Sequence, residues 1–122
     1  LYGPFARGRL VRAFMYGPRD LVRSQQARQT IRRRWDRIFD RVDLLSTPAH
    51  HDAAPKLGDP ASTALMNSFN ALGWPAITVP CGLNQAGLPL SIQLIGRPWD
   101  EATMFRAAQS VEAAGLMPAL AR

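Results

Sequence analysis

Few residues of this sequence have side chains that can carry acid–base or nucleophilic chemistry. The chain contains one lysine, Lys56, one cysteine, Cys81, and two adjacent histidines, His50 and His51. Burial can turn a lysine into a neutral base, whereas the 14 arginines stay protonated. Lys56 lies in a polar stretch with three prolines, which predicts a solvated charge. No pair of residues predicts a nucleophile beside its base, so we expect no catalytic residue in this chain.

The histidines and the cysteine make a poor metal site. On an extended loop His50 and His51 point apart, and we expect both to face solvent. Cys81 follows Pro80 in an apolar stretch with no histidine close in sequence, which favours a structural thiol. A single cysteine cannot form an intrachain disulfide, and we expect a reducing, cytoplasmic environment. The sequence therefore predicts no metal and no other cofactor.

One arginine stands apart from the others. Apolar residues at spacings of three, four and seven predict a helix from Asp20, its expected N-cap, to Val42. Arg28 lies seven residues after Leu21 and seven before Trp35, inside the apolar stripe of that helix. A guanidinium that points at a core needs an anionic or hydrogen-bonding partner. We expect Arg28 to be either a substrate-side cation or a buried structural residue, and not a surface residue.

Positive charge is concentrated in the first third of the chain. The net charge is +6, but residues 1–41 hold eleven arginines against three aspartates, whereas residues 42–122 carry four basic and six acidic residues. A basic helix can neutralise nucleic-acid phosphates, which makes a nucleic-acid-binding module the main alternative class. Against it, the opposite helix face is apolar and no motif that reads DNA or RNA follows. No apolar stretch approaches the roughly 18 residues of a membrane span. We therefore expect neither nucleic acid nor a membrane as a partner.

The remaining pattern predicts an α/β arrangement in one domain. The expected elements are a helix over residues 8–16, a buried strand over 42–47, a long loop over 48–61, a helix over 62–72, a hairpin over 76–83 and 88–96, and a last helix after Asp100 with Met104, Ala108 and Val111 on one face. Gly73 and Gly115 should end the last two helices. Pro80 cannot donate to a sheet, so its strand should lie at an edge or carry a bulge.

Three strands are few for an α/β domain. A strand as apolar as residues 42–47 usually has neighbours on both sides and helices on both faces. The chain also begins with Leu1 rather than an initiator methionine. We therefore expect an incomplete sheet whose remainder belongs to a longer protein.

Three runs resemble the C-terminal part of the amidase signature family. They are NALGWPAITVPCG from Asn70, GLPLSIQLIG from Gly87 and DEAT from Asp100, preceded by QQAR and DLLSTP segments that end at Arg28 and Pro48. The resemblance covers residues 20–115, with 1–19 as a lead-in, so residues 1–122 are expected to be a C-terminal segment of such a domain. It implies an α/β/α sandwich with a mixed sheet, of which this chain holds an incomplete part.

The family resemblance also implies an activity. Amidase signature enzymes act on carboxamides with a serine nucleophile, a second serine and a lysine base, carried upstream on a lysine-bearing helix and a Gly/Ser-rich segment. This chain has no Gly-Gly or Ser-Ser pair. The implied partners are the missing N-terminal portion and a small-molecule amide, with a homodimer left open. The third alternative is a small domain that only binds a partner.

Two positions inform the substrate that the resemblance implies. In the amidotransferase branch, which makes glutaminyl- or asparaginyl-tRNA, an arginine and an acid hold the α-carboxylate and α-amine of the amide donor. Arg28 matches the arginine, whereas the acid position falls at Thr63, which cannot pair with an ammonium group. The resemblance therefore implies Arg28 and Thr63 as substrate-binding positions and favours a plain amidase over an amidotransferase.

Overall fold

The structure of this chain is a computed structural model that describes residues 2–60 and 62–115. The chain divides into two compact units, Leu1–Trp35 and Asp36–Arg122. The division falls inside the single helix predicted over residues 20–42.

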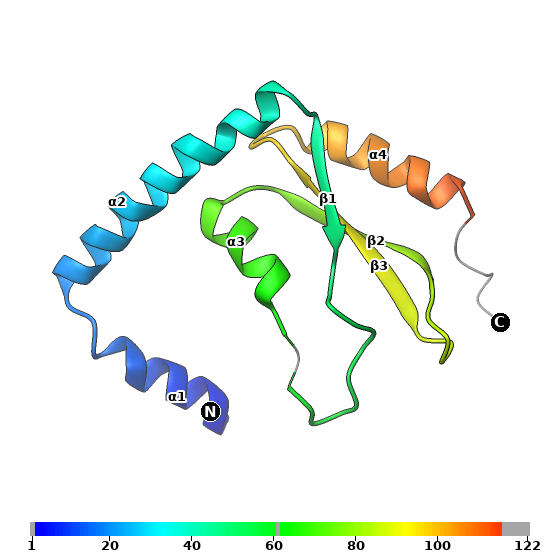
Figure 1. Cartoon of the computed structure of the whole chain (residues 1–122). Helices are drawn as coiled ribbons and strands as arrows, with labels where there is room; N and C mark the ends of the chain where they lie inside the picture. The colour runs from blue at the N-terminus through cyan, green and yellow to red at the C-terminus, as the bar shows by residue number, and fades with distance from the viewer. Residues whose placement is uncertain (1, 61, 116–122) are drawn as a thin grey trace. The chain divides into compact units, whose positions relative to one another are not determined.

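The first unit consists of two helices, α1 (Pro4–Ala13) and α2 (Pro18–Trp35) (Figure 1). α1 begins four residues before the predicted start, because a proline suits the first turn of a helix. The prediction of Asp20 as an N-cap is wrong. Asp20 is the third residue of α2, and its Oδ2 accepts a hydrogen bond from the N–H of Gly17 at 3.0 Å.

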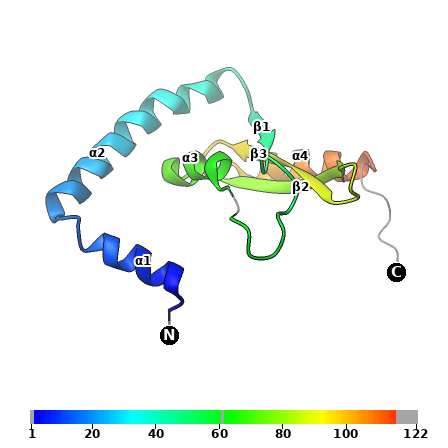
Figure 2. The same ribbon diagram turned by 60° about the horizontal axis from the view of Figure 1, so that its bottom comes forward.

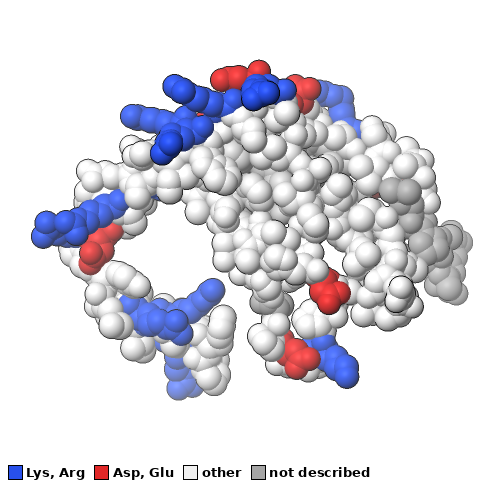
Figure 3. All heavy atoms as spheres, in the orientation of Figure 1, with Lys and Arg blue, Asp and Glu red and all other residues white. Residues whose placement is uncertain are grey.

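The first unit has no core of its own. None of its described residues is buried, and the apolar stripe of α2 is exposed. Phe5 is 77% exposed and Phe14 is 90% exposed. Arginine side chains project along these helices, as Figure 3 shows. The expectation that the stripe of α2 faces a core is therefore not met within this chain.

The second unit contains a small antiparallel sheet with helices. Its elements are η1 (Asp36–Asp40, a 3₁₀ helix), β1 (Leu44–Pro48), α3 (Ala64–Leu72), β2 (Ala76–Leu83), β3 (Pro89–Gly96) and α4 (Glu101–Ala113). The strand order is β1-β3-β2, and both pairings are antiparallel. The predicted loop between β1 and α3 extends beyond the end of the sheet (Figures 1 and 2).

The two outer strands differ in how well the sequence predicted them. β1 starts at Leu44, lies at one edge of the sheet and has no buried residue, so the prediction of a buried strand from residue 42 is wrong. β2 forms the other edge, and its register with β3 shifts between Pro80 and Gly82. The proline therefore has both features predicted for it, the edge position and the bulge.

The predicted helix ends are largely confirmed. Gly73 is the C-cap of α3 with φ 70°, a conformation that glycine adopts without strain. Asp100 is the N-cap residue of α4, but its Oδ1 accepts from the Thr103 hydroxyl at 2.9 Å rather than from a backbone N–H. Gly115, with φ 64°, follows the last turn of α4.

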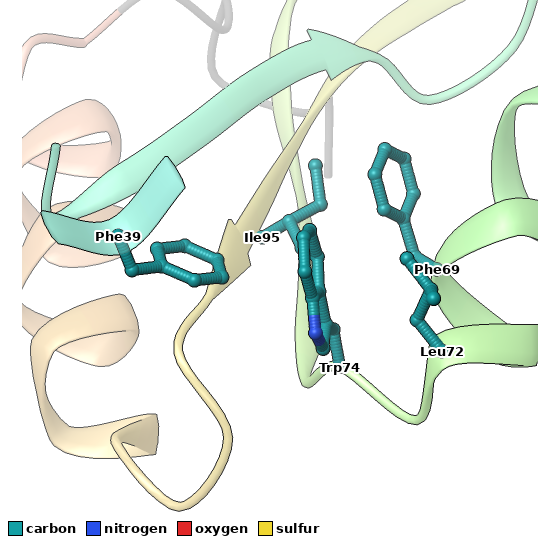
Figure 4. Close-up of a cluster of buried hydrophobic side chains, with 5 residues drawn as sticks. All are labelled: Phe39, Phe69, Leu72, Trp74 and Ile95. Carbon is teal, nitrogen blue, oxygen red and sulfur yellow. The ribbon is translucent and has the colours of Figure 1, made fainter. Parts of the chain in front are cut away.

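Side chains alternate between the two faces of the sheet, and each face has its own core. On one face α4 covers the strands, which agrees with the prediction that Met104, Ala108 and Val111 share one face of this helix. The core there consists of Val79, Leu94 and Ala108, with Ile77, Ile92, Ala107 and Val111 packed against it. The core on the other face consists of Phe39, Phe69, Leu72, Trp74 and Ile95, with Leu45 packed against it (Figure 4).

Trp74 is the centre of the second core. Its ring centroid lies 4.8 Å from that of Phe39 and 6.2 Å from that of Phe69, and Figure 4 shows the indole between these two rings. The indole Nε1 donates a hydrogen bond to Asp36 Oδ1 at 2.8 Å. The guanidinium of Arg97 donates to the carbonyl of Phe39. These contacts attach η1, and with it the start of β1, to the segments before β2 and after β3.

We predict that Trp74→Phe lowers the free energy of unfolding by at least about 1–2 kcal/mol, because the carboxylate of Asp36 loses its indole donor and the smaller ring fills less of the core. Urea unfolding measures the change. Trp99→Phe is the matched control, since Trp99 is 91% exposed and should not alter stability. Equal stability of the Trp74→Phe and control variants would contradict the role given to the hydrogen bond.

A second prediction concerns the crossing of β3 and α4. A Cβ atom on Gly96 would lie 2.8 Å from Met104 Cγ and 3.2 Å from its Sδ. We expect Gly96→Ala to cost about 1–3 kcal/mol, because the buried methionine must move. Gly8→Ala serves as control, since no atom lies within 4 Å of the added methyl. An unfolding midpoint of Gly96→Ala equal to that of the parent would show that α4 does not pack this closely.

Candidate functional site

A groove of about 920 Å³ opens where β1 ends, between the following loop, α3 and the β2–β3 hairpin. Its wall is largely apolar, with proline, alanine, leucine and isoleucine side chains from the loop and the hairpin. Met66 contributes from α3, and Thr47, Thr78 and Ser91 contribute hydroxyl groups from the three strands. Asp52 is the one acidic residue among the described lining residues, and neither lysine nor arginine lines the groove there. Such a surface suits an uncharged ligand part with a few hydrogen-bonding groups.

The two histidines lie at this groove, and the expectation that both face solvent is wrong for His50 alone, because His51 is exposed. His50 is half-buried, and both His50 and His51 line the groove. The backbone N–H of Ala49 donates to the carbonyl of Ser91 at 2.9 Å, which continues the β1–β3 pairing by one residue and holds the start of the loop against β3. In the part of the chain that the structure describes, no three His, Cys, Asp or Glu side chains group closely enough to hold a metal ion.

Cys81 also lines the groove, and it is half-buried. It sits at the register shift of β2, between Pro80 and Gly82. The φ of Gly82 is 150°, a backbone conformation that residues other than glycine rarely adopt. A bulge redirects the side chain next to it. The bulge at Pro80 therefore also affects the direction of Cys81.

A polar row crosses the sheet at the groove. Thr47 of β1 and Thr78 of β2 both lie opposite Gln93 of β3, so the three side chains share one face. Gln93 is 5% exposed, and its Oε1 accepts a hydrogen bond from Thr47 Oγ1 at 3.5 Å. Gln93 was not among the residues predicted from the sequence. The available signal was a glutamine in a strand whose other residues, Ser91 apart, carry no polar side chain.

The substrate-binding residues and the lysine considered in the sequence do not line this groove. Thr63 is the exposed N-cap residue of α3, one turn before Met66, and it is not among the lining residues of the groove. Arg28 is exposed on α2 in the first unit, which contradicts the expectation that it has no surface position in this chain. Lys56 is exposed on the loop and does not line the groove. Over residues 2–60 and 62–115, no helix has the length and apolarity needed to span a membrane.

The sequence profile of the family described as Amidase matches residues 7–105 of this chain. The chain belongs to the amidase family. It is 41% identical over 99 residues to the glutamyl-tRNA(Gln) amidotransferase A subunit of Myxococcus xanthus (strain DK1622), covering 75% of this chain and 20% of that protein. It is 42% identical over 106 residues to a fatty acid amide hydrolase of Oryza sativa subsp. indica, covering 76% of this chain and 17% of that protein. The chain thus spans about a fifth of the length of these relatives.

Solved structures show the same fold. One described as an amidase superposes with a TM-score of 0.85 at 21% identity, over 93% of this chain and 29% of that one. A 6-aminohexanoate cyclic dimer hydrolase superposes with a TM-score of 0.69 at 21% identity, over 85% of this chain and 26% of that one. The amidase fold inferred from the sequence motifs is confirmed.

The groove can be tested through Cys81, because it is the single cysteine of the chain. We predict that Met66→Trp slows alkylation of Cys81 by N-ethylmaleimide, since both residues line the groove and a larger side chain narrows it. Intact-mass spectrometry over time measures the rate. Asn67→Trp on the exposed side of α3 is the matched control and should leave the rate unchanged. Equal slowing by both variants would mean that Met66 and Cys81 do not share a groove.

Proposed function

We propose that this chain is the C-terminal portion of an amidase that hydrolyses carboxamides to a carboxylate and ammonia or an amine. In this proposal the serine nucleophile, the second serine and the lysine base belong to an upstream portion. The observation that carries the proposal is the groove of the second unit, which is present in a chain that spans about a fifth of the length of its relatives. Its apolar wall with a few hydroxyl groups suits the non-reacting part of an amide substrate.

The first unit supports an N-terminal partner portion. Two helices without a buried residue gain little stability from packing, and isolated helices of this length are marginal in water. Apolar side chains such as Phe14 and Met15, at 90% and 79% exposure, lie on a surface that contact with another part of the protein would bury. We propose that the upstream portion of the same enzyme covers them.

The A subunit of an amidotransferase is the second candidate. Several relatives with 41–45% identity have that name. Against it, Thr63 occupies the position at which the sequence resemblance implies an acid that binds an α-amine, and a hydroxyl supplies no charge for that ammonium group. A plain amidase therefore remains the better proposal.

The experiment compares two proteins, the full-length gene product that contains this segment and the isolated 122-residue chain. We expect the full-length protein to release ammonia from a primary carboxamide such as hexanamide, and the isolated chain to release none. Hydrolysis by the isolated chain would contradict the upstream position of the reacting groups. A native protein whose intact mass is 13.5 kDa would contradict the proposal that the chain is a portion of a longer enzyme.

For Arg28 we propose a substrate-side role in the full-length enzyme. Arg28→Met should then raise the KM about tenfold, because a charge-assisted hydrogen bond contributes about 1.5–3 kcal/mol. Steady-state kinetics with a carboxamide that carries a second polar group measure the effect. Arg34→Met on the same helix is the control and should leave the KM unchanged. An unchanged KM for Arg28→Met would assign this arginine a structural or surface role.

A further inference from the structure

We propose that Thr47 recognises a hydrogen-bond donor of the ligand in the groove, and that the buried Gln93 is the positioning residue that orients the Thr47 hydroxyl so that its lone pairs face the groove. The inference rests on the proposed amidase function and names a residue pair that determines specificity at that site.

The geometry places the two groups in one hydrogen-bonded pair. Thr47 and Gln93 are opposite residues in the β1–β3 register, on the face of the sheet that α3 partly covers. Thr47 is half-buried and lines the groove, whereas Gln93 is 5% exposed and lies below it. The Thr47 hydroxyl donates to Gln93 Oε1 at 3.5 Å.

This arrangement determines what Thr47 can offer a ligand. A hydroxyl has one proton and two lone pairs. Because the proton of Thr47 is directed to Gln93, the lone pairs of Oγ1 are left for a donor in the groove. A ligand N–H on Oγ1 would polarise the hydroxyl and strengthen the long bond to Gln93.

The chemical class of the recognised group follows from the charge of the surroundings. Gln93, Thr47 and Thr78 are uncharged, and the described lining residues of the groove include the acidic Asp52 on the loop but no lysine or arginine. The row therefore offers a neutral acceptor, which suits the N–H of a carboxamide or an alcohol O–H. A tertiary amide has neither donor and gains nothing from this contact.

A buried glutamine can also serve the fold alone, and a double-mutant cycle separates the two roles. The experiment uses the full-length protein with hexanamide as substrate and N,N-dimethylhexanamide as a competing ligand that lacks the donor. The variants are Thr47→Val, Gln93→Leu and the double variant. Gln109→Leu is the matched control, because Gln109 is exposed on α4.

We expect each single variant to raise the KM for hexanamide about tenfold with a smaller change in kcat, since one buried hydrogen bond is lost. The KM of the double variant should be no higher than that of the more impaired single variant, because Gln93 acts through Thr47. Thr47→Ser should retain the parental KM. The inhibition constant of N,N-dimethylhexanamide should stay unchanged in Thr47→Val.

Additive effects in the double variant would overturn the positioning role of Gln93. A lower unfolding temperature of Gln93→Leu with an unchanged KM would show that this glutamine serves the fold alone. If Gln93→Leu does not fold, Thr47→Val and Thr47→Ser still test the acceptor role, and an unchanged KM in Thr47→Val overturns it. If the unmodified full-length protein does not hydrolyse hexanamide, both the amidase function and the role of Thr47 and Gln93 are contradicted. If it hydrolyses hexanamide normally and the variants have unchanged KM values, only the role of Thr47 and Gln93 is contradicted.

Discussion

The packing of Trp74 is the constraint on which the second unit depends. Its indole fills the space between Phe39 and Phe69 and binds the carboxylate of Asp36 through Nε1. One side chain thus joins the segment before β1 to the turn between α3 and β2. Because β1 contacts only one neighbouring strand, the position of that strand depends on this attachment as well as on its pairing with β3.

The groove is a consequence of how unequally the two faces of the sheet are covered. α4 packs over one face, while α3 and η1 cover only part of the other. Where that cover ends, the sheet presents threonine hydroxyls above a buried glutamine amide instead of aliphatic side chains. A fully apolar strip in the same place would need another layer of protein to cover it, whereas a hydroxyl row can face a ligand or water. The same strands therefore supply both the core and the wall of the site.

The two units differ strongly in how their apolar side chains are buried. The second unit has two cores and a defined groove, whereas the first exposes apolar and basic side chains together. Under the proposal that an upstream portion covers the first unit, this surface is where its helices gain tertiary contacts. The same proposal accounts for a sheet of three strands, because the chain spans about a fifth of the length of its relatives.

The sequence by itself determined the features that depend on near neighbours: helix ends at glycine, the bulge at Pro80, the hairpin and the family motifs. These depend on backbone conformation and hydrogen-bond capacity, which a few adjacent residues decide. Tertiary structure alone decided that β1 is an edge strand, that His50 turns into the groove, and that Gln93 lies between Thr47 and Thr78. Such relations join residues far apart in the chain, such as Thr47 and Gln93, and no local pattern specifies which strands become neighbours.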